Sequence, residues 1–362
     1  MCDQPIAASY FYAKSREEND LQDSATAGSS PRELPSCLVE PVRRARTVVA
    51  DALQRWTAPG LAPGLAHQLE GGKGLRPALS IWWGERLEVP SEAAEAWGLA
   101  VELLHNAFLI HDDIEDGDRW RRGRQTLWVE AGVPVALNVA DHLLAEAYRT
   151  VAEIPTAAAT VVALVSDFAR THRTTVEGQA LDLLHRADPQ FTLEGYERII
   201  RQKTGRYLAL TWVGPARLAE WDASSIDLLW RLGDELGPAF QVRDDILDLS
   251  TGKGRGGEIG CDIREGKPSI LVAHALAQPQ LAGDRRTRLL EILARPREET
   301  DHAAVDWVIA LFEELGSISF AETEARNRTR AARELFPELP GNDPRCVSEF
   351  EEIAAFLVDR KV

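Results

Sequence analysis

Several features are scarce in this chain, and each scarcity argues against a class of protein. Its 362 residues include 41 Lys and Arg against 57 Asp and Glu, so the formal net charge is −16. A nucleic-acid surface needs clustered basic residues, and this balance argues against one. No apolar run is long enough to span a membrane, and the N-terminus lacks the apolar core of a signal peptide. We therefore expect a cytoplasmic protein with no membrane span and no nucleic-acid partner.

Cysteine is also rare. The chain contains Cys2, Cys37, Cys261 and Cys346, and their spacing is not that of metal ligands. Such a pattern is typical of free thiols in a reducing cytosol.

Strand patterns are missing as well. From Leu38 onward the apolar residues recur at a spacing close to 3.6, and no alternating run of useful length interrupts them. This periodicity predicts an all-α chain, a single large bundle of roughly ten or more helices. Residues 1–36 are rich in Ser, Ala and Asp, and we expect a disordered or loosely packed tail there. Residues 37–362 would then form one helical domain.

What the chain does contain is a pair of acidic clusters with the same pattern, D-D-x-x-D, at Asp112–Asp116 and Asp244–Asp248. Each follows a long stretch of helical periodicity. On a helix, positions i, i+1 and i+4 lie roughly on one face, where carboxylates repel one another. A bound cation would relieve that repulsion, and oxygen ligands favour Mg²⁺. The alternative for either cluster alone is a solvated acidic face.

Five short segments accompany the acidic pair. Each combines basic or polar residues with glycine: Gly71–Pro77, Arg121–Gly123, Gly178–Asp182, Lys203–Gly205 and Gly266–Ser269. Glycine-rich helix starts and paired guanidinium groups suit phosphate oxygens, although each segment alone is compatible with ordinary helix punctuation. Together with the carboxylates they favour a diphosphate substrate. The apolar interior of a helical bundle favours a hydrocarbon for the rest of that substrate.

At this point the sequence resembles the trans-isoprenyl diphosphate synthases of the polyprenyl synthetase group. The matching segments include G-G-K-G-L-R-P, H-D-D-I-E-D-G-D-R-W-R-R-G and F-Q-V-R-D-D-I-L-D, and the resemblance extends from about Leu38 to Lys361. It implies an isoprenoid synthase bundle around a deep central cavity, usually as a homodimer. It also implies head-to-tail addition of an allylic prenyl diphosphate to isopentenyl diphosphate with three Mg²⁺ ions, for which Mn²⁺ is a possible substitute.

The resemblance also assigns roles to individual residues. Metal ligands would be Asp112, Asp116 and Asp244, with direct or water-mediated support from Asp113, Asp245 and Asp248. Contacts to the allylic diphosphate would come from Arg121, Lys203, Gln241 and Lys267. Isopentenyl diphosphate would be held by Lys73, Arg76, His105 and Arg122. The reaction centre would be lined by Gln179 and Thr204, with Asp182 orienting Lys203.

One departure from the family pattern concerns the second acidic cluster. Many members carry a lysine shortly after it, and this chain has Gly257 at that position. One expected contact to the allylic diphosphate is therefore missing, unless Lys253 or Arg255 supplies it.

Product length depends on the residues beneath the first cluster. Phe108 lies four residues before Asp112, so on a helix it is on the same face and about 5–6 Å deeper. In the family, bulky residues at this position and at that of Ala107 stop chain growth early. One large and one small residue predict a medium product in the C15–C25 range, with C20 favoured, as in geranylgeranyl diphosphate synthases. Ordinary core packing is the alternative role for Phe108.

Two other functions remain open. A terpene cyclase on the same fold would ionise and cyclise a prenyl diphosphate without isopentenyl diphosphate. Aromatic side chains could stabilise its cations, and the chain has ten tryptophans, among them Trp82, Trp83, Trp120, Trp128 and Trp212. The intact residues assigned to isopentenyl diphosphate favour elongation instead. The other possibility is a non-catalytic subunit of a heteromeric synthase, which typically loses one acidic cluster, whereas both are kept here.

Overall fold

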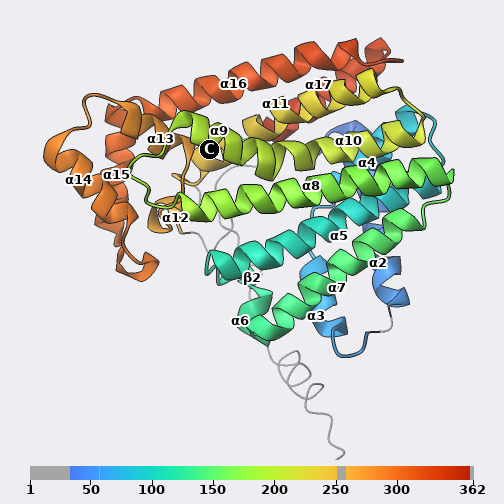
Figure 1. Cartoon of the computed structure of the whole chain (residues 1–362), viewed down its shortest axis with the longest axis horizontal. Helices are drawn as coiled ribbons and strands as arrows, with labels where there is room; N and C mark the ends of the chain where they lie inside the picture. The colour runs from blue at the N-terminus through green and yellow to red at the C-terminus, as the bar shows by residue number, and fades with distance from the viewer. Residues whose placement is uncertain (1–32, 57, 251–257, 359–362) are drawn as a thin grey trace, which may run out of the picture.

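A computed structural model describes residues 33–56, 58–250 and 258–358 of the chain. Helices dominate this part, and the predicted all-α class is confirmed (Figure 1). The α-helices are α2 (Val39–Arg55), α3 (Ala62–Leu69), α4 (Leu75–Arg86), α5 (Ser91–Glu115), α6 (Leu127–Ala131), α7 (Val133–Ala152), α8 (Ala158–Leu184), α9 (Leu193–Ile200), α10 (Arg206–Leu218), α11 (Ala223–Leu247), α12 (Cys261–Arg264), α13 (Ile270–Ala277), α14 (Gly283–Leu293), α15 (His302–Glu314), α16 (Ser317–Leu335) and α17 (Pro344–Val358). Most of the tail predicted for residues 1–36 lies outside the described residues.

Short elements complete the fold. Three are 3-10 turns: η1 (Ser36–Leu38), η3 (Arg297–Glu299) and η4 (Phe336–Glu338). The segment η2 (Arg201–Gly205) is a π-helical turn between α9 and α10. Strands β1 (Trp120–Arg121) and β2 (Arg124–Gln125) form a small antiparallel hairpin after α5. Within the described residues no helix is both long and apolar enough to cross a membrane.

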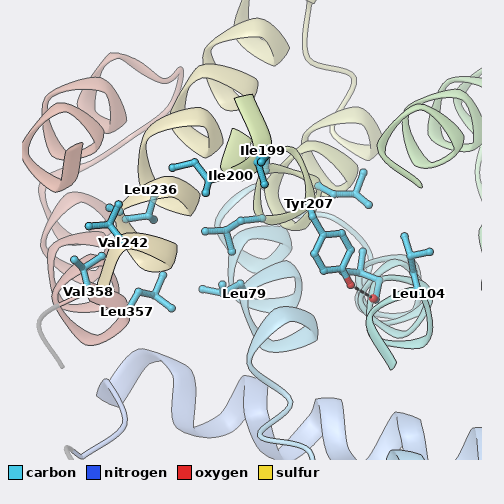
Figure 2. Packing of buried hydrophobic residues seen from close by; sticks show 14 of the residues in the cluster. Leu79, Leu104, Ile199, Ile200, Tyr207, Leu236, Val242, Leu357 and Val358 are labelled. Carbon is cyan, nitrogen blue, oxygen red and sulfur yellow. Dashed lines mark hydrogen bonds between the residues drawn. The ribbon is translucent and has the colours of Figure 1, made fainter. Parts of the chain in front are cut away.

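The helices pack as one bundle with α10 near its centre. Helix α10 contacts α4, α5, α8 and α11, while α5 also packs on α7 and α11 on α16. Figure 1 shows α8 and α10 running side by side across the molecule. Figure 2 shows part of the buried core around Leu79, Tyr207 and Leu236. The two helices that carry the acidic clusters, α5 and α11, therefore lie on opposite sides of α10.

Buried aromatic residues fix α5 against α10. The Trp97 indole Nε1 donates to the Leu210 carbonyl oxygen at 2.9 Å, and the Tyr207 hydroxyl donates to the Val101 carbonyl oxygen at 2.6 Å. Gly214 makes room for the indole, because a Cβ there would lie 1.9 Å from Trp97 Cε2. Buried polar groups need such partners, so these bonds set the register of the two helices.

Two glycines allow the π-helical turn η2 to pack closely between α8 and α11. A Cβ on Gly178 of α8 would lie 2.8 Å from the Lys203 backbone nitrogen. A Cβ on Gly237 of α11 would lie 2.5 Å from the Gly205 Cα. Only hydrogen side chains allow backbones to approach so closely. The contact holds Thr204 within hydrogen-bonding distance of Gln241, one turn before the second acidic cluster.

Candidate active site

Both acidic clusters face one cavity of about 380 Å³. Asp112 and Asp116 reach it from the end of α5, and Asp244 and Asp245 reach it from the end of α11. The C-terminal end of a helix carries partial negative charge, so carboxylates there are unfavourable until a cation neutralises them. The fold concentrates that negative charge on two opposing walls.

Most of the residues predicted for the site line this cavity. Besides the four aspartates they are Arg76, His105, Phe108, Arg121, Gln179, Asp182, Lys203, Thr204, Gln241 and Lys267. Lys73, Arg122, Asp113 and Asp248 do not line it. The sequence order of the segments thus translates into a common location for all but four of the predicted residues.

The two aspartates outside the lining have protein partners instead. Arg121 Nε donates to Asp113 Oδ1 at 2.5 Å, and burial raises the pKa of Asp113 to about 7 although Arg121 opposes the rise. Asp248 is fully buried, and its Oδ2 accepts a hydrogen bond from the Asp262 backbone nitrogen at 2.9 Å. Asp113 therefore orients Arg121, and Asp248 secures the first residues of α12.

Lys73 and Arg122, the two predicted basic residues outside the lining, belong to two loops that approach each other. Lys73 and Arg122 are both exposed. Arg122 Nη1 lies 3.5 Å from the position that a Cβ on Gly72 would take. The loop before α4 and the hairpin after α5 therefore meet at the surface beside the cavity.

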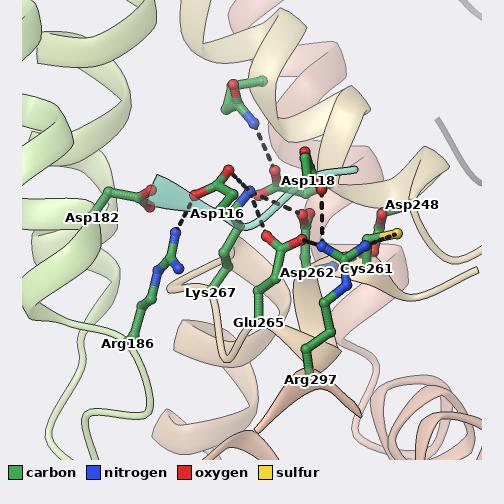
Figure 3. Close-up of polar contacts among 12 residues, drawn as sticks. Asp116, Asp118, Asp182, Arg186, Asp248, Cys261, Asp262, Glu265, Lys267 and Arg297 are labelled. Atoms are coloured by element: carbon green, nitrogen blue, oxygen red, sulfur yellow. Dashed lines mark hydrogen bonds and ion pairs between the residues drawn. The ribbon is translucent and has the colours of Figure 1, made fainter. Parts of the chain in front are cut away.

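Two cations pair with Asp116. Lys267 Nζ donates to Asp116 Oδ2 at 2.8 Å, and Arg186 donates to Oδ1 (Figure 3). Burial acts to raise the pKa of Asp116, but Lys267, Lys203 and Arg186 hold it well below its usual range. The carboxylate is therefore ionised at all ordinary pH values.

Further pairs connect the first wall to α8 and η2. Lys203 Nζ donates to Asp182 Oδ2 at 3.2 Å, which is the contact expected from the sequence. Gln179 Nε2 donates to Glu115 Oε2 at 2.6 Å. Burial opposes the charge of Lys203, but Asp112 and Asp182 raise its pKa, so the ammonium persists.

On the second wall, Asp245 acts as an acceptor for several donors. Gln241 Nε2 donates to its Oδ1 at 2.9 Å, and the Tyr196 hydroxyl donates to its Oδ2 at 2.8 Å. Thr204 Oγ1 in turn donates to Gln241 Oε1 at 3.3 Å. Asp245 thus orients Gln241 and Thr204 in the cavity.

Arg76 and His105 form a basic pair at another part of the cavity. Arg76 Nη1 lies 3.0 Å from His105 Nε2, and its guanidinium carbon lies 5.2 Å from the centre of the Tyr207 ring. Burial, and then the charges of Arg76 and Arg122, hold the pKa of His105 well below its usual range. The neutral ring therefore accepts a hydrogen bond from Arg76, whose guanidinium has further N–H donors for an anion.

Part of the lining is apolar. It includes Phe108, Leu109, Leu183, Ile199 and Phe240. Phe108 lies one turn before Asp112, and its ring packs edge-on against Tyr207 and His172, with centroids 5.8 and 5.5 Å away. Among the described residues that line the cavity there is no tryptophan. One cavity therefore joins a charged part to a hydrocarbon-like part.

Sequence reasoning missed several residues around the second wall. Arg297, from η3, donates to Asp118 Oδ1 and Glu265 Oε1 at 2.9 Å each and to Glu258 Oε2 at 3.0 Å (Figure 3). Glu265 also pairs with Lys267 at 2.8 Å. These contacts link the loops that follow the two clusters. The family lysine expected after the second cluster is replaced by Gly257, and Lys253 and Arg255 are its candidate substitutes. All three residues lie outside the described part of the chain.

The donor set fits a hard divalent cation that shares its ligands with a substrate. The cavity offers carboxylate oxygens on two walls, but nowhere in the described ranges do three His, Cys, Asp or Glu side chains converge as a metal cage. Mg²⁺ is usually bound by one or two carboxylates together with water and substrate phosphates. Asp112, Asp116 and Asp244 could hold it in this way.

Comparisons with known proteins agree on one family. The family model for polyprenyl synthetase matches residues 61–312. The geranylgeranyl pyrophosphate synthase of Geoglobus acetivorans is 31% identical over 317 residues, which cover 86% of this chain and 94% of that protein. The geranylgeranyl pyrophosphate synthetase structure from Pyrococcus horikoshii has a TM-score of 0.79 and 29% identity, covering 90% of this chain and 98% of that one. A polyprenyl synthase structure from Caulobacter crescentus, complexed with calcium and isoprenyl diphosphate, has a TM-score of 0.78 and 27% identity, covering 92% and 100%.

Proposed function

Because this chain belongs to the polyprenyl synthetase family and is a trans-prenyltransferase, we propose that it condenses an allylic prenyl diphosphate with isopentenyl diphosphate in a metal-dependent reaction. The observation that carries the proposal is the single cavity in which two carboxylate walls, several cations and an apolar lining meet. That combination matches a diphosphate joined to a hydrocarbon. The preferred metal is Mg²⁺, as three ions per site, with Mn²⁺ as a substitute.

Each part of the cavity has a role in this reaction. Lys203, Lys267 and Arg121 bind the allylic diphosphate, and the Arg76–His105 pair binds isopentenyl diphosphate. When bound, the divalent cation supplies charge that stabilises the departing diphosphate. The allylic C–O bond breaks and the diphosphate leaves with the electron pair. The double bond of isopentenyl diphosphate then forms the new C–C bond, and a proton passes to the released diphosphate.

The apolar wall protects this chemistry and limits the product. Water would quench an allylic cation, so the hydrocarbon part of the cavity must stay dry. Phe108 stands one turn below Asp112, where the tail of the growing chain would extend. We propose a medium-chain product of C15–C25, with C20 favoured.

The cyclase alternative gains no support from the aromatic residues that motivated it. Trp82, Trp83 and Trp212 are fully buried in the core, away from the cavity lining. The Arg76–His105 pair gives a second anionic substrate a place that a cyclase does not need. Elongation therefore remains the proposal.

Incubation with allylic diphosphates tests it. The protein is supplied with Mg²⁺ and geranyl, farnesyl or geranylgeranyl diphosphate, with and without isopentenyl diphosphate, and the products are identified by mass. Longer prenyl diphosphates that form only when isopentenyl diphosphate is present support elongation. A hydrocarbon or alcohol that forms without it would overturn elongation, and a cyclic product would favour the cyclase.

We also propose a homodimer, supported by the outer surface of α8. Val162, Val176 and Leu184 are exposed to 69%, 50% and 77%. Val162 and Leu184 lie equally far from Arg173 along the helix, so an antiparallel copy around a two-fold axis near Arg173 would pair them. Val176 also lines the cavity, so the second copy would cover the outer side of its wall.

The dimer is tested by sedimentation equilibrium. The double variant Val162→Glu, Leu184→Glu should be monomeric, whereas Val39→Glu, at a comparably exposed apolar residue, should remain dimeric. A wild-type protein that is monomeric at micromolar concentration would refute the proposal.

A further inference from the structure

Arg186 contacts a cavity carboxylate from outside the cavity. It is the second residue after α8 ends, and it does not belong to the cavity lining. Its guanidinium donates to Asp116 Oδ1, while Lys267, which does line the cavity, takes Asp116 Oδ2 at 2.8 Å. Figure 3 shows the two cations at the two carboxylate oxygens. The side chain of Asp116 is only 2% exposed, so these neighbours determine its orientation.

The backbone around Arg186 is built to hold it there. Ala187 has φ of 53°, a left-handed conformation that is uncommon for a residue with a Cβ. Its backbone nitrogen donates to the Gly266 carbonyl oxygen at 2.9 Å, directly before Lys267. Gly266 has φ of 60°, and a Cβ there would lie 2.3 Å from the Leu293 carbonyl oxygen. The turn with Arg186 and the loop with Lys267 thus form one joined unit.

We propose that Arg186 is a positioning residue for the metal site. It holds Asp116 Oδ1 from behind, so that Oδ2 stays directed at the cavity and is available to a divalent cation once Lys267 turns to the diphosphate. The inference rests on the proposed function only in requiring that the cavity bind a divalent cation with a diphosphate. Partners of metal-ligating carboxylates orient them, and their loss typically weakens metal binding about ten- to hundredfold.

Binding of Mn²⁺ in the presence of inorganic diphosphate tests this role without turnover. Free Mn²⁺ is measured by electron paramagnetic resonance during titration of the protein. Arg186→Gln should bind Mn²⁺ about ten- to hundredfold more weakly than the wild type. Arg186→Lys keeps the positive charge but loses the planar guanidinium with its paired N–H donors, so its affinity should lie between those of the wild type and Arg186→Gln. The matched control is Arg43→Gln on α2, because Arg43 is 68% exposed, pairs with Glu40 of the same helix and lies outside the cavity lining, and its affinity should equal that of the wild type.

A double-mutant cycle separates positioning from a general structural effect. In an Asp116→Asn background the Arg186→Gln change should cost little further affinity, because the group it positions is already altered. Unchanged Mn²⁺ affinity in Arg186→Gln, with or without a lower melting temperature, would overturn the proposal, and so would an equal loss in the Asp116→Asn background. If Arg186→Gln does not fold, Arg186→Lys carries the same cycle. If the cycle shows that Arg186 and Asp116 are coupled in Mn²⁺ binding but the protein transfers no prenyl group, the proposed function is refuted and the role of Arg186 is not.

Discussion

Gly237 offers the sharpest test of how the fold positions the site. In the Gly237→Ala variant the new Cβ would lie 2.5 Å from Gly205 Cα, 2.9 Å from its nitrogen and 3.0 Å from the Thr204 carbonyl carbon. All three atoms are backbone, so no side chain can swing aside. Helix α11 and η2 must separate by about 1 Å to reach an ordinary contact of 3.4 Å.

The expected effect on stability is small, and the effect on rate is large. Overpacking costs about 1–3 kcal/mol, and the better helix propensity of alanine returns about 1 kcal/mol. A displacement of 1 Å in a reacting group, however, can cost about a hundredfold in rate. Lys203 and Thr204 move with η2 while Gln241 and Asp244 move with α11, so the two halves of the site lose their alignment.

The assay is the steady-state rate of diphosphate release alongside a thermal melt. We expect Gly237→Ala to remain folded at the assay temperature and to lose about two orders of magnitude in rate. The control is Gly60→Ala, where nothing lies within 4 Å of the added Cβ, and it should behave like the wild type. A Gly237→Ala enzyme with normal rate and normal melting temperature would refute the close-contact argument.

Three further predictions concern the residue that limits product length, the metal and the core. Phe108→Ala should lengthen the product identified by mass spectrometry, and an unchanged chain length would show that Phe108 does not limit chain growth. Chelation by EDTA should abolish activity, and Mg²⁺ should restore it, with little change in melting temperature because Asp116 and Asp113 already have cationic partners; full activity in EDTA would contradict metal dependence. Glu349→Ala should lower the free energy of unfolding by about 1–3 kcal/mol, because the change removes a hydrogen-bond partner from Trp82 and from Arg86. The catalytic rate at temperatures below the melting temperature should stay unchanged. A melting temperature equal to that of the wild type would contradict this role of Glu349.

The fold class and many of the charged and polar residues that line the cavity could be predicted because their signals are local. Apolar residues recur with a period close to 3.6 along the chain, and each basic or acidic segment spans only a few consecutive residues. The pattern D-D-x-x-D did not reveal which carboxylates face the cavity. Adjacent residues on a helix point about 100° apart, so Asp112 lines the cavity while Asp113 turns to Arg121.

Other parts of the site depend on tertiary packing and left no signal in the sequence. Arg186 and Arg297 lie outside the short segments, and only the folded chain brings them to Asp116 and to Glu265. Likewise, Asp248 belongs to the second cluster but serves the backbone of α12. Roles of this kind depend on which loops meet, and a linear pattern does not contain that information.

The central claim is that both acidic walls act on one diphosphate. Diphosphate release from an allylic substrate, measured for Asp112→Ala and Asp244→Ala, tests it most directly. The control is Asp227→Ala, an exposed aspartate on α11 outside the cavity lining. The account predicts that each wall variant loses orders of magnitude in rate while the control keeps the wild-type rate. Near-normal release by either wall variant would contradict it.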